Sequence, residues 1–123
     1  MKTKELRIGD LIEYNGNIYP VAAIDHNSVT IFRDNATICP SDRVINFIPL
    51  TEERLLKLGN AEKKRFPDEV DVYDRFRFIW KDAYKYWYVV TIKSKEYLTK
   101  IEFVHEYQNF IFALTGEELK IIT

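Results

Sequence analysis

The sequence is poor in the residues that cross-link, break or loosen a small chain. Of its 123 residues, one is cysteine, four are glycine and four are proline. A single cysteine, Cys39, excludes an internal disulfide framework and suits a reducing compartment. With 46% hydrophobic and 30% charged residues, the composition also excludes collagen-like, disordered and low-complexity classes. One globular protein with a core of its own is expected at this length.

Long apolar runs and a strong net charge are missing as well. No run approaches the roughly 20 apolar residues that span a bilayer, and the charged start, residues 1–7, is not followed by an apolar segment. We therefore expect a soluble, cytoplasmic protein with no membrane partner. The 18 basic and 19 acidic residues give a net charge of -1, so only a local concentration of charge can favour a charged partner.

The first part of the chain has the pattern of short strands joined by tight turns. Asn15-Gly16 predicts a hairpin with a type I′ turn, because both residues tolerate positive φ. Strands are expected at residues 6–14, 17–24, 29–33, 36–39 and 44–48. Five short strands bury their apolar faces best by curling, so we predict a small SH3-like β-barrel over residues 1–50.

The rest of the chain predicts an antiparallel sheet and one longer helix. Residues 51–71 are expected to form a short helix at 52–58 and a charged connector. Strands are expected at residues 72–80, 86–93 and 97–102, and a docked strand at 117–123. From Phe103 the apolar period changes to 3.6 residues, which predicts a helix ending near Gly116. The predicted fold is α+β: the barrel, then a β-hairpin covered by the C-terminal helix over residues 72–123, packed as one unit.

Three stretches carry a resemblance to a known group of proteins. They are Leu6-Arg-Ile-Gly-Asp-Leu-Ile with Asn15-Gly16, Ile48-Pro-Leu-Thr-Glu-Glu53, and the segment from Phe103 to Leu119. Together they resemble an uncharacterised family of small proteins found in Bacteroidetes genomes and their phages or mobile elements. The resemblance covers both ends of the chain and implies no activity, but it favours an accessory protein of phage or mobile-element origin.

Most catalytic and metal-binding signatures are absent from the sequence. The segment His105-Glu-Tyr-Gln-Asn109 begins like a zinc-binding helix, but asparagine stands where the second histidine must be. Cys39 with His105 and Asn109 or Asp25 is an alternative nucleophile, base and orienting group. A cysteine that ends an apolar strand before proline is more simply a small packed hydrophobe. We expect no enzyme activity, no metal and no cofactor.

Aromatic and basic residues concentrate in one segment. Fourteen of the 18 aromatic residues lie between Phe66 and Phe112, and residues 75–100 hold seven basic and two acidic residues. Cations beside exposed rings suit single-stranded nucleic acid, because cations hold phosphates and rings stack on bases. If the register permits, one face of the hairpin carries both arginines, Lys93 and Trp87. The predicted binding residues are Arg75, Arg77, Lys85, Trp87 and Lys93.

Two other interpretations of this segment stay open. The rings can be ordinary core, with lysines and arginines solvating the outer face. Alternatively, Tyr86-Trp-Tyr88 places large side chains on both strand faces, and one helix covers only one of them. A protein partner or a second copy would then cover the other face. We expect a non-enzymatic accessory protein acting through a protein interface on this hairpin, with weak, sequence-tolerant binding of single-stranded nucleic acid as the alternative.

A second polar group lies on the predicted C-terminal helix. Its members share the helix face opposite the apolar stripe. They are His105, Gln108, Asn109 and Phe112. An amide pair beside a ring can bind the edge of a ligand, but we favour the interpretation that the amides cap a neighbouring loop.

Overall fold

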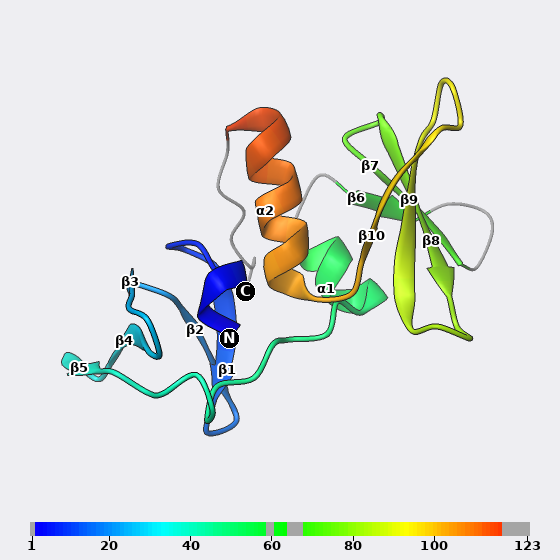
Figure 1. Cartoon of the computed structure of the whole chain (residues 1–123). Coiled ribbons are helices and arrows are strands. Elements are labelled where there is room, and N and C mark those ends of the chain that lie inside the picture. Colours follow the sequence, from blue (N-terminus) through cyan, green and yellow to red (C-terminus); the bar gives the residue numbers. More distant parts are fainter. Residues whose placement is uncertain (1, 59–60, 64–67, 117–123) are drawn as a thin grey trace. The chain divides into compact units, whose positions relative to one another are not determined.

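The computed structural model of the chain describes residues 2–58, 61–63 and 68–116 (Figure 1). The fold is α+β, with antiparallel sheets and, in these ranges, two α-helices. The described residues form two compact units. The first holds residues 2–49 and 103–116, and the second holds residues 50–58, 61–63 and 68–102.

The first unit combines short N-terminal strands with the C-terminal helix. Its elements are the 3-10 turn η1 (Lys2–Glu5), strands β1 (Leu11–Tyr14), β2 (Asn17–Pro20), β3 (Ala23–Ile24), β4 (Val29–Arg33) and β5 (Ala36–Ile38), and helix α2 (Val104–Thr115). Strands β1 and β2 form one sheet, and β3, β4 and β5 form another. The core between them consists of small aliphatic side chains, among them the fully buried Ile12, Ile31 and Ile45.

The predicted Asn15-Gly16 turn is confirmed. Both residues have positive φ, 51° and 80°, and Tyr14 pairs with Asn17 across the turn. The left-handed backbone at these two positions is the reason why this dipeptide, and few others, suits the hairpin.

The expected SH3-like barrel is not confirmed, since no closed barrel is seen in the described part of the chain. The strand expected at 44–48 is also wrong: there Asn46 forms only an isolated bridge with Glu13. The strands are two to five residues long, so each buries little apolar surface of its own. Helix α2 contacts β1 and buries Val104, Tyr107 and Ile111. A helix thus covers apolar surface that the strands were expected to bury by closing into a barrel.

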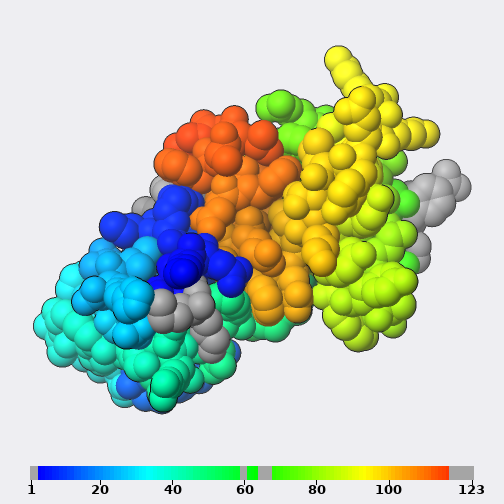
Figure 2. All heavy atoms as spheres, in the orientation of Figure 1, coloured from blue at the N-terminus to red at the C-terminus, as the bar shows by residue number. Residues whose placement is uncertain are grey.

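The second unit is a five-stranded antiparallel sheet with one short helix. Its elements are α1 (Glu52–Lys57), β6 (Ala61–Lys63), β7 (Glu69–Val72), β8 (Phe76–Lys81), β9 (Tyr86–Thr91) and β10 (Tyr97–Ile101), and the strand order is β10-β9-β8-β7-β6. The expected short helix is present, and Thr51 caps it, because its hydroxyl accepts a hydrogen bond from the Arg54 N–H. The side chains of the β9–β10 turn, yellow in Figure 2, stand out from the surface.

Two expectations about this part of the chain differ from the structure. The segment expected to be a connector contains β6 and β7, because Val70 and Val72 alternate with acidic residues and complete the buried face of the sheet. Helix α2 belongs to the first unit, whereas it was expected to share a lobe with the hairpin over residues 72–123. The strand expected at 117–123 lies outside the described residues.

Candidate functional site

The two faces of the five-stranded sheet differ in character. Residues that pair across antiparallel strands point to the same side of the sheet. The pairing therefore collects the apolar, buried residues on one face. It carries Val70, Val72, Phe76, Phe78, Trp87, Val89 and Ile101. Phe76, Phe78 and Trp87 are almost completely buried, so these rings belong to the core.

The opposite face carries tyrosines and lysines. Tyr86 and Tyr88 alternate with the buried Trp87 along β9 and so point to this side. The register places Tyr86 opposite Lys81 and Tyr88 opposite Lys100, and Tyr97 pairs with β9 two residues further on, at Val90. The turn after β8 adds one more ring. We call these residues the Tyr–Lys face: Lys81, Tyr84, Tyr86, Tyr88, Tyr97 and Lys100.

The rings of the Tyr–Lys face form two pairs. Tyr84 stacks on Tyr86, with ring centroids 5.7 Å apart and an interplanar angle of 17°, and Tyr88 lies 4.5 Å from Tyr97. Exposed fractions of 70% for Tyr84 and 52% for Tyr97 leave one ring of each pair open to solvent. Each pair thus offers an accessible aromatic surface.

Each ring pair also holds one lysine. The Lys100 ammonium lies 5.3 Å from the centroid of the Tyr86 ring, and the Lys81 ammonium lies 5.5 Å from that of Tyr88. Neither lysine forms an ion pair with any residue that the structure describes. A cation–π contact at an exposed site contributes only about 0.5–1 kcal/mol, so both ammonium groups can move to an anionic ligand.

Three of the five predicted binding residues are engaged within the chain. Arg77 donates from Nε to Asp71 Oδ1 at 2.9 Å, and this hydrogen bond holds the pKa of Arg77 above its ordinary value. Lys85 pairs with Asp82 at 2.9 Å in the turn after β8. Trp87 is 3% exposed and belongs to the core, so its expected place beside the arginines is wrong: it pairs with Trp80 on the buried face.

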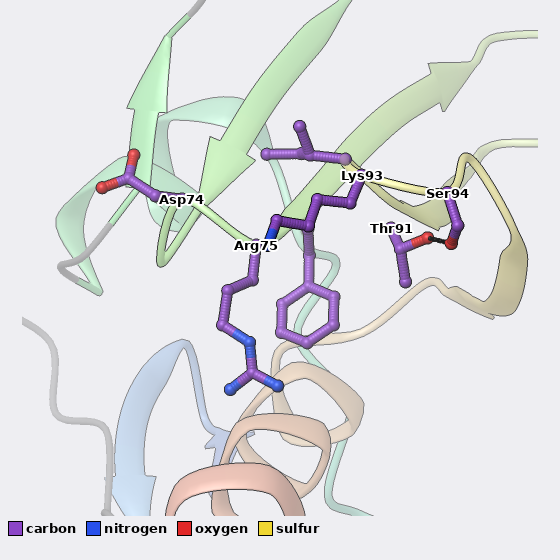
Figure 3. Close-up of a pocket in the computed structure, with 7 residues that line it drawn as sticks. Asp74, Arg75, Thr91, Lys93 and Ser94 are labelled. Carbon is purple, nitrogen blue, oxygen red and sulfur yellow. Dashed lines mark hydrogen bonds between the residues drawn. The ribbon is translucent and has the colours of Figure 1, made fainter.

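The structure brings the other two predicted residues, Arg75 and Lys93, together. They line one pocket of about 320 Å³, where the β7–β8 turn meets the start of the β9–β10 turn (Figure 3). Pairing of Phe76 with Thr91 in β8 and β9 brings the two turns to the same end of the sheet. Lys85 lies at the other end of these strands.

The polar group on α2 is structural. The Gln108 side chain accepts from the Leu11 N–H at 2.8 Å and donates to the Gly9 carbonyl oxygen at 3.1 Å. Asn109 accepts from Arg7 Nε and donates to the Glu5 carbonyl oxygen. Both amides thus hold the segment before β1, as the loop-capping interpretation expects.

The other two members of this group form ring contacts. The Arg7 guanidinium lies 4.0 Å from the centroid of the Phe112 ring. The His105 ring is buried, 4.2 Å from Phe47 and stacked on Phe103 at 5.8 Å. Burial lowers the pKa of His105 below its ordinary value of 6.5. The imidazole, Phe47 and Phe103 form one ring cluster, so His105 is a packing residue.

Reasoning from the sequence missed the residues of the Tyr–Lys face, although a signal for them exists. Tyr86-Trp-Tyr88 has large rings on both sides of β9, so the strand alone does not show which ring is buried. The neighbouring strand β8 does, because its buried side chains share a face with Trp87. That register identifies the tyrosines as outward-facing. Lys81 and Lys100 follow from the same register.

Cys39 is exposed, so the expectation that it packs as a small hydrophobe is wrong. It directly follows β5, an edge strand, and alternates with the half-buried Ile38. Within the described ranges, no three His, Cys, Asp or Glu side chains gather in a way that could hold a metal ion. No helix in these ranges has the length and apolar character needed to cross a membrane.

Comparison of the chain with protein-family models, with curated proteins and with solved structures finds no match. Functional conclusions therefore depend on the geometry of the chain's own residues.

Proposed function

We propose that the Tyr–Lys face binds single-stranded nucleic acid with little sequence preference. The observation that carries this proposal is the pairing of solvent-accessible tyrosine rings with lysines that have no carboxylate partner among the described residues. Tyrosine rings stack on bases of any sequence, at about 1–3 kcal/mol per base, and lysines bind the phosphates between them.

The spacing of the rings favours an extended single strand. Tyr86 and Tyr88 are two residues apart on one strand, which separates their Cα atoms by about 6.6 Å. Stacked bases within one strand of a duplex are only about 3.4 Å apart. The two ring pairs, which Tyr86 and Tyr88 anchor, are thus offset along the strand by more than one base step, and a paired duplex keeps its base faces covered.

A protein interface on the hairpin stays a prediction. Trp87, the residue best suited to the centre of such an interface, is buried within one copy of the chain. The exposed rings on this face are tyrosines, and the lysines beside them have no carboxylate partner in the described ranges, a combination that suits a polyanion better than an apolar partner. The absence of enzyme activity and the origin in a phage or mobile element also stay predictions.

Fluorescence anisotropy with a labelled oligothymidylate at low salt tests the proposal. The variant Tyr84→Ala/Tyr97→Ala should weaken binding about tenfold or more, because the two solvent-accessible stacking rings are lost. Lys81→Gln/Lys100→Gln should lower the slope of log affinity against log salt by about 1.4, since each phosphate contact on a single strand contributes about 0.7. Lys57→Gln is the matched control, because Lys57 is already paired with Glu53 on α1.

Three results would contradict the proposal. The first is no detectable binding at low salt, and the second is equal loss of affinity in the Lys57 control. The third is equal affinity for duplex DNA, which would indicate a purely electrostatic surface. Displacement of the strand by an acidic protein, together with unchanged strand binding in Tyr84→Ala/Tyr97→Ala, would favour a protein interface.

A further inference from the structure

The pocket at one end of the five-stranded sheet has no place in the function proposed above. It lies between the β7–β8 turn and the β9–β10 turn, which the Arg75 carbonyl oxygen joins by accepting from the Ile92 N–H at 2.9 Å. Tyr73, Asp74 and Lys95 have positive φ of 55°, 53° and 58°, a backbone conformation that occurs in tight turns.

Two cations of the pocket have no counterion in the described part of the chain. Neither Arg75 nor Lys93 forms an ion pair there. The Arg75 guanidinium lies 5.2 Å from the centroid of the Phe76 ring, which orients it without neutralising it. The one acidic residue on the pocket wall is Asp74, and Figure 3 shows its carboxylate pointing away from the Arg75 guanidinium.

A pair of hydroxyl groups adds a hydrogen-bond donor. Thr91 Oγ1 and Ser94 Oγ lie 2.5 Å apart, so one hydroxyl donates to the other (Figure 3). Thr91 Oγ1 also accepts from the Glu96 N–H at 3.1 Å. Whichever hydroxyl donates within the pair, the hydrogen of the other is left for an external acceptor. The pocket thus presents a guanidinium, an ammonium and a hydroxyl donor.

We propose that this pocket binds a phosphate monoester. A dianion with several acceptor oxygens matches the two cations, which have no counterion among the described residues, and arginine suits phosphate geometry because its donors form a fork. The volume of about 320 Å³ exceeds what a phosphate group needs and is in the range of small-molecule sites, so the organic part of the ester fits beside Phe76 and Ile92. The pocket shares no residue with the Tyr–Lys face, so an experiment can contradict one proposal and support the other.

Two sources could supply this chemistry: a free phosphate ester, or the terminal phosphate of a nucleic acid strand. Titration of the isotope-labelled protein with inorganic phosphate and with phenyl phosphate, followed by NMR, tests the shared chemistry. We expect saturable shifts of the backbone amides of Arg75, Lys93 and Ser94, with phenyl phosphate binding more tightly. Sodium chloride at matched ionic strength should not reproduce them.

Variants assign the binding to this pocket. Arg75→Gln/Lys93→Gln should weaken phenyl phosphate binding about tenfold or more, because two charge-assisted contacts are lost. Lys95→Gln is the matched control, since Lys95 is exposed in the same turn but does not line the pocket. Circular dichroism checks that each variant is folded. If the double variant is unfolded, the NMR shifts of the unmodified protein show by their position whether phenyl phosphate binds in this pocket.

The source is separated by comparing an oligothymidylate with and without a 5′-phosphate. A gain in affinity from the phosphate that Arg75→Gln/Lys93→Gln removes would assign the pocket to strand ends, whereas binding of phenyl phosphate alone would assign it to free esters. Both results support the phosphate site. Shifts that sodium chloride reproduces, shifts that map elsewhere, or an equal loss in Lys95→Gln would overturn it. Tyr86→Ala/Tyr88→Ala should leave phenyl phosphate binding unchanged.

Discussion

The indole N–H of Trp87 donates a hydrogen bond to the backbone carbonyl oxygen of Leu50 at 2.7 Å. Both residues are almost completely buried, with exposed fractions of 3% and 1%. The Leu50 N–H in turn donates to the Glu102 carbonyl oxygen at 2.9 Å. Leu50 therefore has both backbone groups bonded within the second unit, one of them by a side chain of the sheet.

Replacing Trp87 by phenylalanine should destabilise the protein by about 1–3 kcal/mol, because it leaves the buried carbonyl oxygen of Leu50 without its donor. The smaller ring adds a cavity cost in the same direction. Urea unfolding followed by circular dichroism measures the difference. Trp80→Phe is the matched control, since the Trp80 N–H contacts an exposed Asp82 oxygen at 3.4 Å, and its loss should cost less. Equal effects would contradict a structural role for the Trp87 bond.

Much of the local structure was predictable, because it depends on near neighbours in the sequence. The Asn15-Gly16 turn, the Thr51 cap and the left-handed Gly116 after α2 each follow from the conformational preference of one or two residues. The assignment of helices and strands to the two units was not predictable, because it depends on which apolar faces pack against each other. The apolar period of helix α2 predicts that one side of the helix is buried, but it does not identify the sheet against which that side packs.

The same distinction holds for the candidate site. Sequence reasoning named the segment that contains the Tyr–Lys face, since a local excess of charge and rings can be counted without coordinates. It chose the wrong ring, because Trp87 and its tyrosine neighbours differ only in which side of β9 they occupy, and a shift of one residue exchanges the two faces. It also counted Arg77 as available, although Asp71 lies across the strand pair from it.

Gln108 should be among the most sensitive polar residues of the first unit. Replacing it by leucine leaves the Leu11 N–H and the Gly9 carbonyl oxygen without its side-chain bonds, and we expect a loss of about 2–4 kcal/mol. Asn109→Ala is the control: this side chain is only half-buried, so water can replace its bonds and the loss should be smaller. Urea unfolding of both variants measures the difference. A larger loss for Asn109→Ala would contradict the role assigned to Gln108.

The pair formed by Arg77 and Asp71 should contribute measurable coupling to stability. Asp71 is 5% exposed and accepts two hydrogen bonds from the guanidinium, at 2.9 and 3.3 Å. A double-mutant cycle with Arg77→Gln and Asp71→Asn should give about 1 kcal/mol, reduced from a fully buried value because the arginine is partly exposed. The exposed pair of Lys85 and Asp82 is the control and should show much weaker coupling. Equal coupling in both cycles would show that burial of Asp71 adds nothing.

The buried imidazole of His105 predicts a dependence of stability on pH. Its Nε2 lies 3.6 Å from a Glu5 carboxylate oxygen, beyond hydrogen-bond distance, and neither ring nitrogen has a hydrogen-bond partner in the described part of the chain. Burial lowers its pKa, and the negative charges of Glu106 and Glu5 oppose this shift without cancelling it. The unfolded chain, with an ordinary pKa of 6.5, therefore binds a proton more readily than the folded protein.

The contribution of His105 should be complete above about pH 6.5 and decline as the pH falls below it, by at most about 1.4 kcal/mol per pH unit. His105→Phe keeps a ring in contact with Phe47 and Phe103 but cannot take up a proton, so the decline in stability due to His105 should disappear. Urea unfolding at several pH values between about 5 and 8 measures both slopes, and their difference isolates His105 from the carboxylates. Parallel slopes for His105→Phe and the unmodified protein would show that the imidazole titrates alike in the folded and unfolded chains.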